Sequence, residues 1–306
     1  MHTNAGGVPA PGPSATPPRP GVWLTDVTLV LMALIWGVNF VVVKFATTVL
    51  PPFAFNAVRV SLAAVALMII AAIGRSPWPN RRQTLSLLGL GVLGNGIYQM
   101  FFVQGVARTR AGDAALLIAA TPAFIALIGR VRGVERIGRK AWMGVLLSVL
   151  GIGLISGAAA VSGFHGSLFG DLLILGGSLS WALYTVLLKP FTHVVDGLKL
   201  AALTMAGGSA LLVLFAWRAV LATPWGAAPP AAWGAMAYSG LGALVIAYIF
   251  WYRGVRLIGP TRTAMYSNLQ PVIAVIVAWV VLGELPTLWQ GVGAASIMSG
   301  LLLTRS

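Results

Sequence analysis

Two stretches of this sequence share their ends and their apolar character. Residues 36–44 read Trp-Gly-Val-Asn-Phe-Val-Val-Val-Lys, and residues 181–189 read Trp-Ala-Leu-Tyr-Thr-Val-Leu-Leu-Lys. Each begins with tryptophan, ends with lysine and carries polar side chains within an otherwise apolar segment. A helix in the core of a soluble protein has no need of those polar groups, whereas a helix that crosses a membrane can turn them toward a protein interior.

The likeness of these two stretches extends along the whole chain. The step from 36 to 181 is 145 residues, and the same step relates Asp26 to Asp171 and Lys44 to Lys189. A step of 149 residues relates later positions, namely Phe101 to Phe250, Gly105 to Gly254, Pro122 to Pro271, Glu135 to Glu284 and Gly151 to Gly300. The change between the two steps fits one small insertion. We therefore predict two related halves, residues 25–158 and 168–304, that derive from one ancestral unit.

The composition indicates that lipid is the main solvent of this protein. Of its 306 residues, 58% are hydrophobic and only 8% are charged, and the mean hydropathy is +0.90. Soluble domains carry about 25% charged residues. The net charge of +14 would suggest nucleic acid in a soluble protein, but here the basic residues lie between apolar runs, so we expect no nucleic-acid partner. The absence of cysteine excludes disulfides and thiolate chemistry.

The apolar residues group into runs of the length that a membrane-spanning helix needs, about 20 residues. Residues 1–24, rich in proline, glycine and alanine, are expected to form a disordered tail. The sequence after this tail predicts an all-α integral membrane protein of ten transmembrane helices. The runs are 26–46, 53–73, 83–106, 112–130, 141–158, 168–188, 198–218, 232–254, 260–282 and 287–304.

The basic residues between the runs predict how the chain crosses the membrane. With a cytoplasmic N-terminus, 12 lysines and arginines fall on the inner side and 4 on the outer side, from Lys44, Arg108, Arg110 and Arg218. Both termini are then cytoplasmic. Because five is odd, the second half enters the membrane from the opposite side, so the repeats are inverted. Inverted repeats with a substrate site near the midplane are typical of secondary transporters.

With these features the sequence resembles the EamA-type drug/metabolite transporters, which are bacterial permeases with ten helices built from a duplicated unit of five. The resemblance covers residues 25–304. It is carried by the run 36–44, Pro52 followed by Arg59, Pro122, the Gly-Val-Glu-Arg-Ile of 133–137, Gly-Asp at 170–171, the run from Gln270-Pro271 to Glu284, and Gln290-Gly291. It implies a permease or exporter of small metabolites in the cytoplasmic membrane, most similar to the amino-acid exporter type. A carrier of organic cations or nucleosides with the same fold is the alternative, followed by a channel or a membrane enzyme.

Polar and aromatic residues inside the predicted spans are the candidates for a substrate path. Asn95, Tyr98, Gln99 and Phe102 share one helical face, since they follow at i, i+3, i+4 and i+7. Aromatic faces would contact apolar or cationic parts of a substrate, and amides would bind its amino and carboxyl groups. The competing interpretation is that these residues only bridge helices. The complete set is Trp36, Asn39, Asn95, Tyr98, Gln99, Phe102, Trp181, Tyr184, Tyr248, Trp251 and Asn268.

Three further residues have predicted structural or gating roles. Pro122 and Pro271 are symmetry partners near the centres of two spans, where a proline bends a helix, so they are candidate gates or static kinks. Arg59 is the one charged group predicted inside a span, and a structural role is expected for it.

Several reaction classes find no support in the sequence. His2, His165 and His193 lie in the tail or in loops, so no metal site and no cofactor are expected, and the protein is predicted not to be an enzyme. The phosphate-binding loop of ATP-driven pumps is missing. The six acidic residues fall at span ends or in loops, which favours facilitated transport over ion coupling. A monomer is expected, with an oligomer left open.

Overall fold

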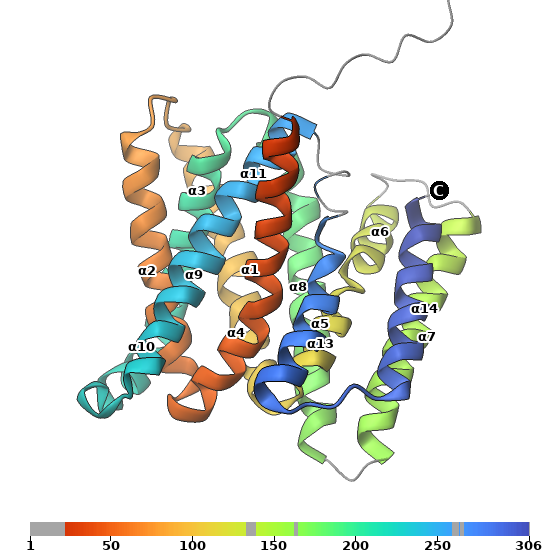
Figure 1. The fold of residues 1–306 in the computed structure, drawn as a ribbon. Helices are drawn as coiled ribbons and strands as arrows, with labels where there is room; N and C mark the ends of the chain where they lie inside the picture. Colours follow the sequence, from red (N-terminus) through yellow and green to blue (C-terminus); the bar gives the residue numbers. More distant parts are fainter. Residues whose placement is uncertain (1–21, 133–138, 162–164, 259–262, 264–265, 306) are drawn as a thin grey trace, which may run out of the picture.

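The computed structural model describes residues 22–132, 139–161, 165–258, 263 and 266–305, and every regular element in these ranges is a helix (Figure 1). The first half contains α1 (Val22–Val49), α2 (Pro52–Ile73), α3 (Arg81–Gly91), η1 (Val92–Ile97), α4 (Tyr98–Arg108), α5 (Ala111–Ile118), α6 (Thr121–Val131) and α7 (Arg139–Val161). The second half contains α8 (His165–Leu188), η2 (Lys189–His193), α9 (Gly197–Ala222), η3 (Trp225–Ala227), α10 (Pro230–Ala237), η4 (Tyr238–Ile246), α11 (Ala247–Ile258), α13 (Leu269–Leu282) and α14 (Leu288–Arg305).

Seven helical stretches in the described ranges are long and apolar enough to cross a membrane. They are 23–49, 52–73, 81–108, 111–131, 168–193, 197–222 and 230–254, and two shorter apolar helices cover 142–155 and 269–282. Large apolar side chains such as Ile73, Leu214 and Val280 point outward, which suits a surface that faces lipid. The protein is therefore a multi-pass membrane protein, and the count of ten spans stays a prediction.

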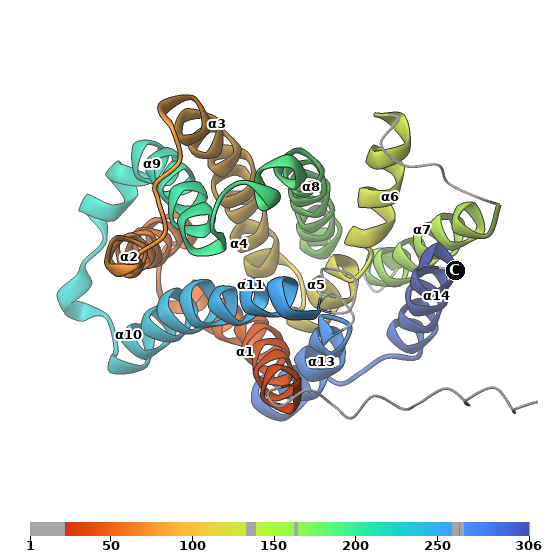
Figure 2. The same ribbon diagram turned by 90° about the horizontal axis from the view of Figure 1, so that it is seen from above.

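Most of the helix packing joins one half of the chain to the other. The two closest partnerships are α7 with α14 and α2 with α9, which lie at opposite edges of the bundle (Figure 2). Between them α4 packs on α8, and α1 packs on α13 and α11. The start of α1 and the end of α14 lie at the same end of the bundle (Figure 1). The halves are thus interleaved.

The predicted tail is too long by a few residues. Helix α1 already begins at Val22, inside the range 1–24 that the composition assigned to disorder. No proline lies between Pro20 and Pro51, and Trp23 and Leu24 add to the apolar surface of α1, so the helix extends toward the N-terminus. Residues 1–21 lie outside the described part of the chain, as does Glu135 with the motif 133–137.

Pro122 and Pro271, the candidate gates or kinks, each lie just after an interruption of a helix, and their gating role stays a prediction. Turn residues 119–120 separate α5 from α6, and Pro122 lies in the first turn of α6. Turn residues 267–268 precede α13, whose third residue is Pro271. A proline is tolerated in the first turn because the N–H that it lacks has no partner there. Each proline therefore marks the start of a new helical segment inside a predicted span.

Two other spans contain wider, π-helical turns but continue as helices. The π-helical segments η1 and η4 interrupt α3–α4 and α10–α11, and they overlap when shifted by the 149-residue step. A π-helix closes its hydrogen bonds over five residues instead of four, and such segments are frequent at functional sites. Here η1 carries Asn95 and η4 carries Ser239.

Candidate functional site

A cluster of aromatic side chains occupies the middle of the bundle. Its rings touch one another at centroid distances of 5.0 to 6.5 Å. We call this set the aromatic cluster, and its members are Trp36, Phe40, Tyr98, Phe102, Trp181, Tyr184, Tyr248, Trp251 and Tyr252. Seven of these nine were predicted from the sequence, so the structure brings the aromatic candidates together.

Both halves of the chain contribute to the aromatic cluster. Helices α1 and α4 supply the first four rings, and α8 and α11 supply the rest. The link between the halves is direct, since Tyr98 meets Trp181 at 5.0 Å and Trp36 meets Tyr248 edge-on at 6.0 Å. Aromatic pairs of this geometry contribute about 0.5–1.5 kcal/mol each. Trp181, Tyr98 and Trp36 remain half-buried, so each keeps part of its surface open.

Two asparagines beside the cluster are buried with an unused polar atom. Asn95 accepts a hydrogen bond from the Tyr248 hydroxyl at 3.2 Å, but its Nδ2 has no partner within the described part of the chain. Asn39 on α1 is 6% exposed, and its Oδ1 is likewise unpaired among the residues described. A buried amide atom without a partner costs about 1–3 kcal/mol of stability. A ligand that forms a hydrogen bond with the atom offsets this cost. One amide offers a donor and the other an acceptor.

Close backbone contacts hold Asn95 and its neighbours in place. A Cβ added to Gly208 on α9 would come within 2.4 Å of the Asn95 carbonyl carbon, and one added to Gly94 would meet the Tyr184 ring at 2.3 Å. Only glycine allows helices to approach so closely. The π-helical segment η1 is therefore wedged between α8 and α9, with little freedom for Asn95 to turn away.

Beside the cluster, Arg59 on α2 is fully buried and bound by neutral groups. Its Nε donates to Asn56 Oδ1 at 3.1 Å, and its two terminal nitrogens donate to Ser239 Oγ at 2.7 Å and Gln99 Oε1 at 2.6 Å. The guanidinium also lies 5.8 Å from the centroid of the Phe102 ring. Sequence reasoning placed Gln99 on the substrate path, but its side chain is engaged by Arg59.

Two members of this group were missed from the sequence. Asn56 lies one turn before Arg59, a spacing that could have indicated it, and its Nδ2 also donates to the Gln99 carbonyl at 3.0 Å. Ser239 carried no signal, because the π-helix that presents it is not recognisable from composition.

Other predicted residues take part in helix ends or in contacts between helices. Asn268 is the N-cap of α13, just before Pro271. Trp36 uses its indole N–H, which donates to the Ala243 carbonyl of η4 at 2.8 Å. Of Pro122 the structure places only the backbone, at the start of α6.

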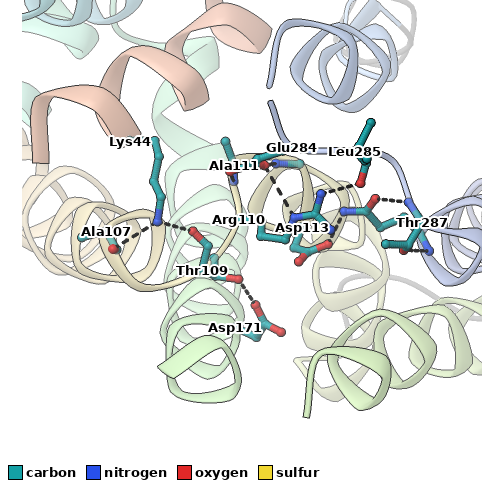
Figure 3. A network of polar contacts seen from close by, with 12 residues as sticks. Lys44, Ala107, Thr109, Arg110, Ala111, Asp113, Asp171, Glu284, Leu285 and Thr287 are labelled. Carbon is teal, nitrogen blue, oxygen red and sulfur yellow. Dashed lines mark hydrogen bonds and ion pairs between the residues drawn. The ribbon is translucent and has the colours of Figure 1, made fainter. Parts of the chain in front are cut away.

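At one end of the bundle, polar contacts tie the two halves together (Figure 3). The Glu284 carboxylate accepts from the N–H of Ala111 at 3.1 Å and of Gly112 at 3.3 Å, and Arg110 Nε lies 3.9 Å from the same carboxylate. The full set, called the end network here, also includes Thr109 with Asp171 (2.5 Å), Gln290 with Asp113 (2.6 Å) and Arg110 with the Leu285 carbonyl (2.6 Å). Lys44 donates to the carbonyls of Ala107 and Thr109, and these bonds fix the end of α4 where the chain turns toward α5.

An apolar cavity of about 260 Å³ lies away from the aromatic cluster, between α5, α13 and α14. Its lining runs from Leu116 and Pro271 to Gln290 of the end network. The predicted cavity between the aromatic residues is a different place. In this conformation the rings of the aromatic cluster are in contact with one another, while Trp36, Tyr98 and Trp181 stay half-buried.

Comparisons with known proteins agree with this architecture. Residues 23–157 and 168–306 each match the sequence model of the EamA-like transporter family. An uncharacterized transporter of Archaeoglobus fulgidus is 30% identical over 92% of this chain and 97% of its own length. A probable terminal-alkyne amino-acid exporter of Streptantibioticus cattleyicolor is 28% identical over 90% of this chain and 91% of its own length. A solved crystal structure with 21% identity superposes with a TM-score of 0.61 over 92% of this chain and 97% of that one, which shows a shared fold.

Proposed function

Because the chain belongs to the EamA-like transporter family, we propose that it is a secondary carrier that moves small metabolites, in particular amino acids, across the cytoplasmic membrane by alternating access. The relatives are transporters, not enzymes. The observation that carries the proposal is the aromatic cluster with the unused amide atoms of Asn39 and Asn95 beside it. Aromatic faces and free amides are what a small zwitterion with an apolar side chain needs.

The proposal includes ten spans in two inverted repeats. The two segments that match the family support a duplicated unit. The packing supports it too, because the partnership of α1 with α13 has its counterpart in that of α8 with α5 and α6 under the predicted correspondence. With both termini cytoplasmic, the end network lies on the outer side.

The end network supports a closed outer gate in this conformation. Glu284 and Asp171 of the second half bind backbone and hydroxyl groups of the turn between α4 and α5 in the first half. Opening this end requires those contacts to break, and the interruptions before Pro122 and Pro271 are suited to absorb the movement. Since the halves interleave, the moving bodies must combine helices of both halves rather than follow the repeat boundary.

The energy source proposed is the substrate gradient. In the described ranges, Asp26, Asp113 and Asp171 lie in the first two turns of their helices, and Asp196 and Glu284 lie between helices. None of these five is a member of the aromatic cluster. Proton-coupled carriers commonly hold a carboxylate within the membrane close to the substrate.

Transport by the purified protein in liposomes tests the proposal. Labelled amino acids should enter with saturable kinetics and exchange against unlabelled substrate on the other side. Tyr98→Ala removes ring contacts to Phe102 and Trp181, so we expect transport to fall about twofold to tenfold. Phe215→Ala is the matched control, since it removes a ring contact to Phe53 on the bundle periphery. Exchange of amines or nucleosides alone would favour the alternative carriers, and unsaturable flux would indicate a channel.

A further inference from the structure

We infer that Arg59 binds the carboxylate of the transported molecule, so that the substrate is a carboxylate-bearing compound rather than an organic cation or a neutral nucleoside. This assignment rests on the proposed function, since it gives a role to a residue beside the proposed substrate site.

The first observation is that Arg59 is a buried cation whose partners among the described residues are all neutral. Its side chain is 0% exposed, and it donates to an amide, a hydroxyl and a second amide, from Asn56, Ser239 and Gln99. A guanidinium stays charged at every physiological pH. Its charge therefore has to be balanced by something other than a shift in protonation.

The second observation is where the negative charges lie. The carboxylates of the described residues sit at the two ends of the bundle, and the ion pair found there joins Glu284 to Arg110 instead. Burying a charge without a counter-ion costs several kcal/mol even when neutral groups bind it. A buried arginine without a counter-ion, in the middle of a carrier, is suited to bind an anionic substrate.

The third observation is that Arg59 borders the aromatic cluster. Phe102 lies 5.8 Å from the guanidinium on one side and stacks on Tyr98 on the other. Arg59 has five N–H groups, and the three described bonds leave donors for an incoming carboxylate. The unpaired Asn95 Nδ2 supplies another donor near the same rings.

Other groups at the cluster suit the opposite charge. Asn39 has a carbonyl oxygen without a partner among the described residues, and the rings of Trp36 and Trp251, whose centroids lie 5.8 Å apart, are of the kind that attract a cation. A molecule with an anionic group at Arg59, an ammonium near Asn39 and an apolar part among the rings matches all three. That is the chemical description of an amino acid with an apolar or aromatic side chain.

The competing explanation is that Arg59 only clamps α2 to α4 and η4. The wild-type protein separates the two through a panel of four compounds that share one side chain: phenylalanine, its amine phenethylamine, its amide, and the deaminated acid 3-phenylpropanoate. Each is measured as a competitor of transport in liposomes and as a stabiliser of the purified protein in thermal unfolding. We expect phenylalanine and the acid to compete and stabilise about 10-fold to 100-fold better than the amine and the amide, as for loss of a hydrogen-bonded charge.

The variant Arg59→Gln should remove this preference, so that phenylalanine and its amide, which differ only in the carboxylate, become equivalent within about threefold. Arg75→Gln, which removes an exposed arginine just beyond the same helix, should leave the preference intact. If Arg59→Gln does not fold, Arg59→Lys keeps the charge but loses the forked geometry, and the preference should shrink rather than vanish.

Each outcome of these measurements supports or overturns the role of Arg59, the proposed transport, or both. Equal effects of acid, amide and amine on the wild type overturn the assignment, and so does a preference that persists in Arg59→Gln. If carboxylates stabilise the wild type but no amino acid is transported, the carboxylate site stands and the proposed amino-acid transport fails. If amino acids are transported without any preference for the carboxylate, transport stands and the role of Arg59 fails.

Discussion

Replacing Glu284 by glutamine should open the end of the bundle that the end network closes. The substitution keeps the size of the side chain but turns one carboxylate oxygen into an NH₂ group, which cannot accept. One of the two bonds from the N–H groups of Ala111 and Gly112 is then lost, together with the charge that faces Arg110.

The size of the effect follows from these contacts. A hydrogen bond to a charged group contributes about 1.5–3 kcal/mol. The ion pair adds less than about 1 kcal/mol, because its atoms are 3.9 Å apart and the Arg110 side chain is 33% exposed. A loss of about 1.5–3 kcal/mol shifts the equilibrium between closed and open forms about 10-fold to 150-fold toward the open form.

The natural absence of cysteine makes this equilibrium measurable. Ala114→Cys places one thiol at a fully buried position one turn into α5, which a reagent reaches only when this end opens. Labelling by a membrane-impermeant thiol reagent should accelerate about 10-fold to 150-fold when Glu284→Gln is added. Asp196→Asn is the control, because it changes a carboxylate that caps its own helix by accepting from the N–H of Leu198 and has no part in the end network. Equal labelling rates with and without Glu284→Gln would refute the gate.

Two further predictions concern the support of the site. Gly208→Ala would force a methyl group within 2.4 Å of the Asn95 backbone, so the protein should lose about 1–3 kcal/mol of stability; a lower Tm than for Gly234→Ala, where nothing lies within 4 Å, checks this. Ser239→Ala removes an acceptor at 2.7 Å from Arg59 and should cost about 1.5–3 kcal/mol in thermal unfolding, whereas an unchanged Tm would mean that this bond adds nothing.

The sequence was sufficient to predict the helical membrane class and the meeting of the aromatic residues. Helical periodicity puts Tyr98 and Phe102 on one face, and the repeat relates Trp36 to Trp181, so a common interior was the natural inference. The family resemblance is confirmed by the two matched segments. The substrate role of these residues stays a prediction.

The parts that could not be predicted depend on which helix faces which. Gln99 lies on the predicted face, but its partner is Arg59, and that follows only from how α4 crosses α2. Hydropathy also gives no sign of π-helical turns, whose extra residue per hydrogen-bonded ring rotates the following side chains. The prolines likewise indicated an irregular helix without showing whether it bends or stops.

The interleaved packing has a consequence for the time at which the protein is made. Ser239, a hydrogen-bond partner of Arg59, is synthesised 180 residues after it. At about 5–20 residues per second, the synthesis of this stretch takes roughly 10 to 40 s. Throughout that interval a newly inserted α2 carries a cation while α9, its main partner, is still emerging or unmade. The insertion machinery must therefore hold the early helices together until the later ones arrive, and a chain stopped halfway would be a ready target for membrane proteases.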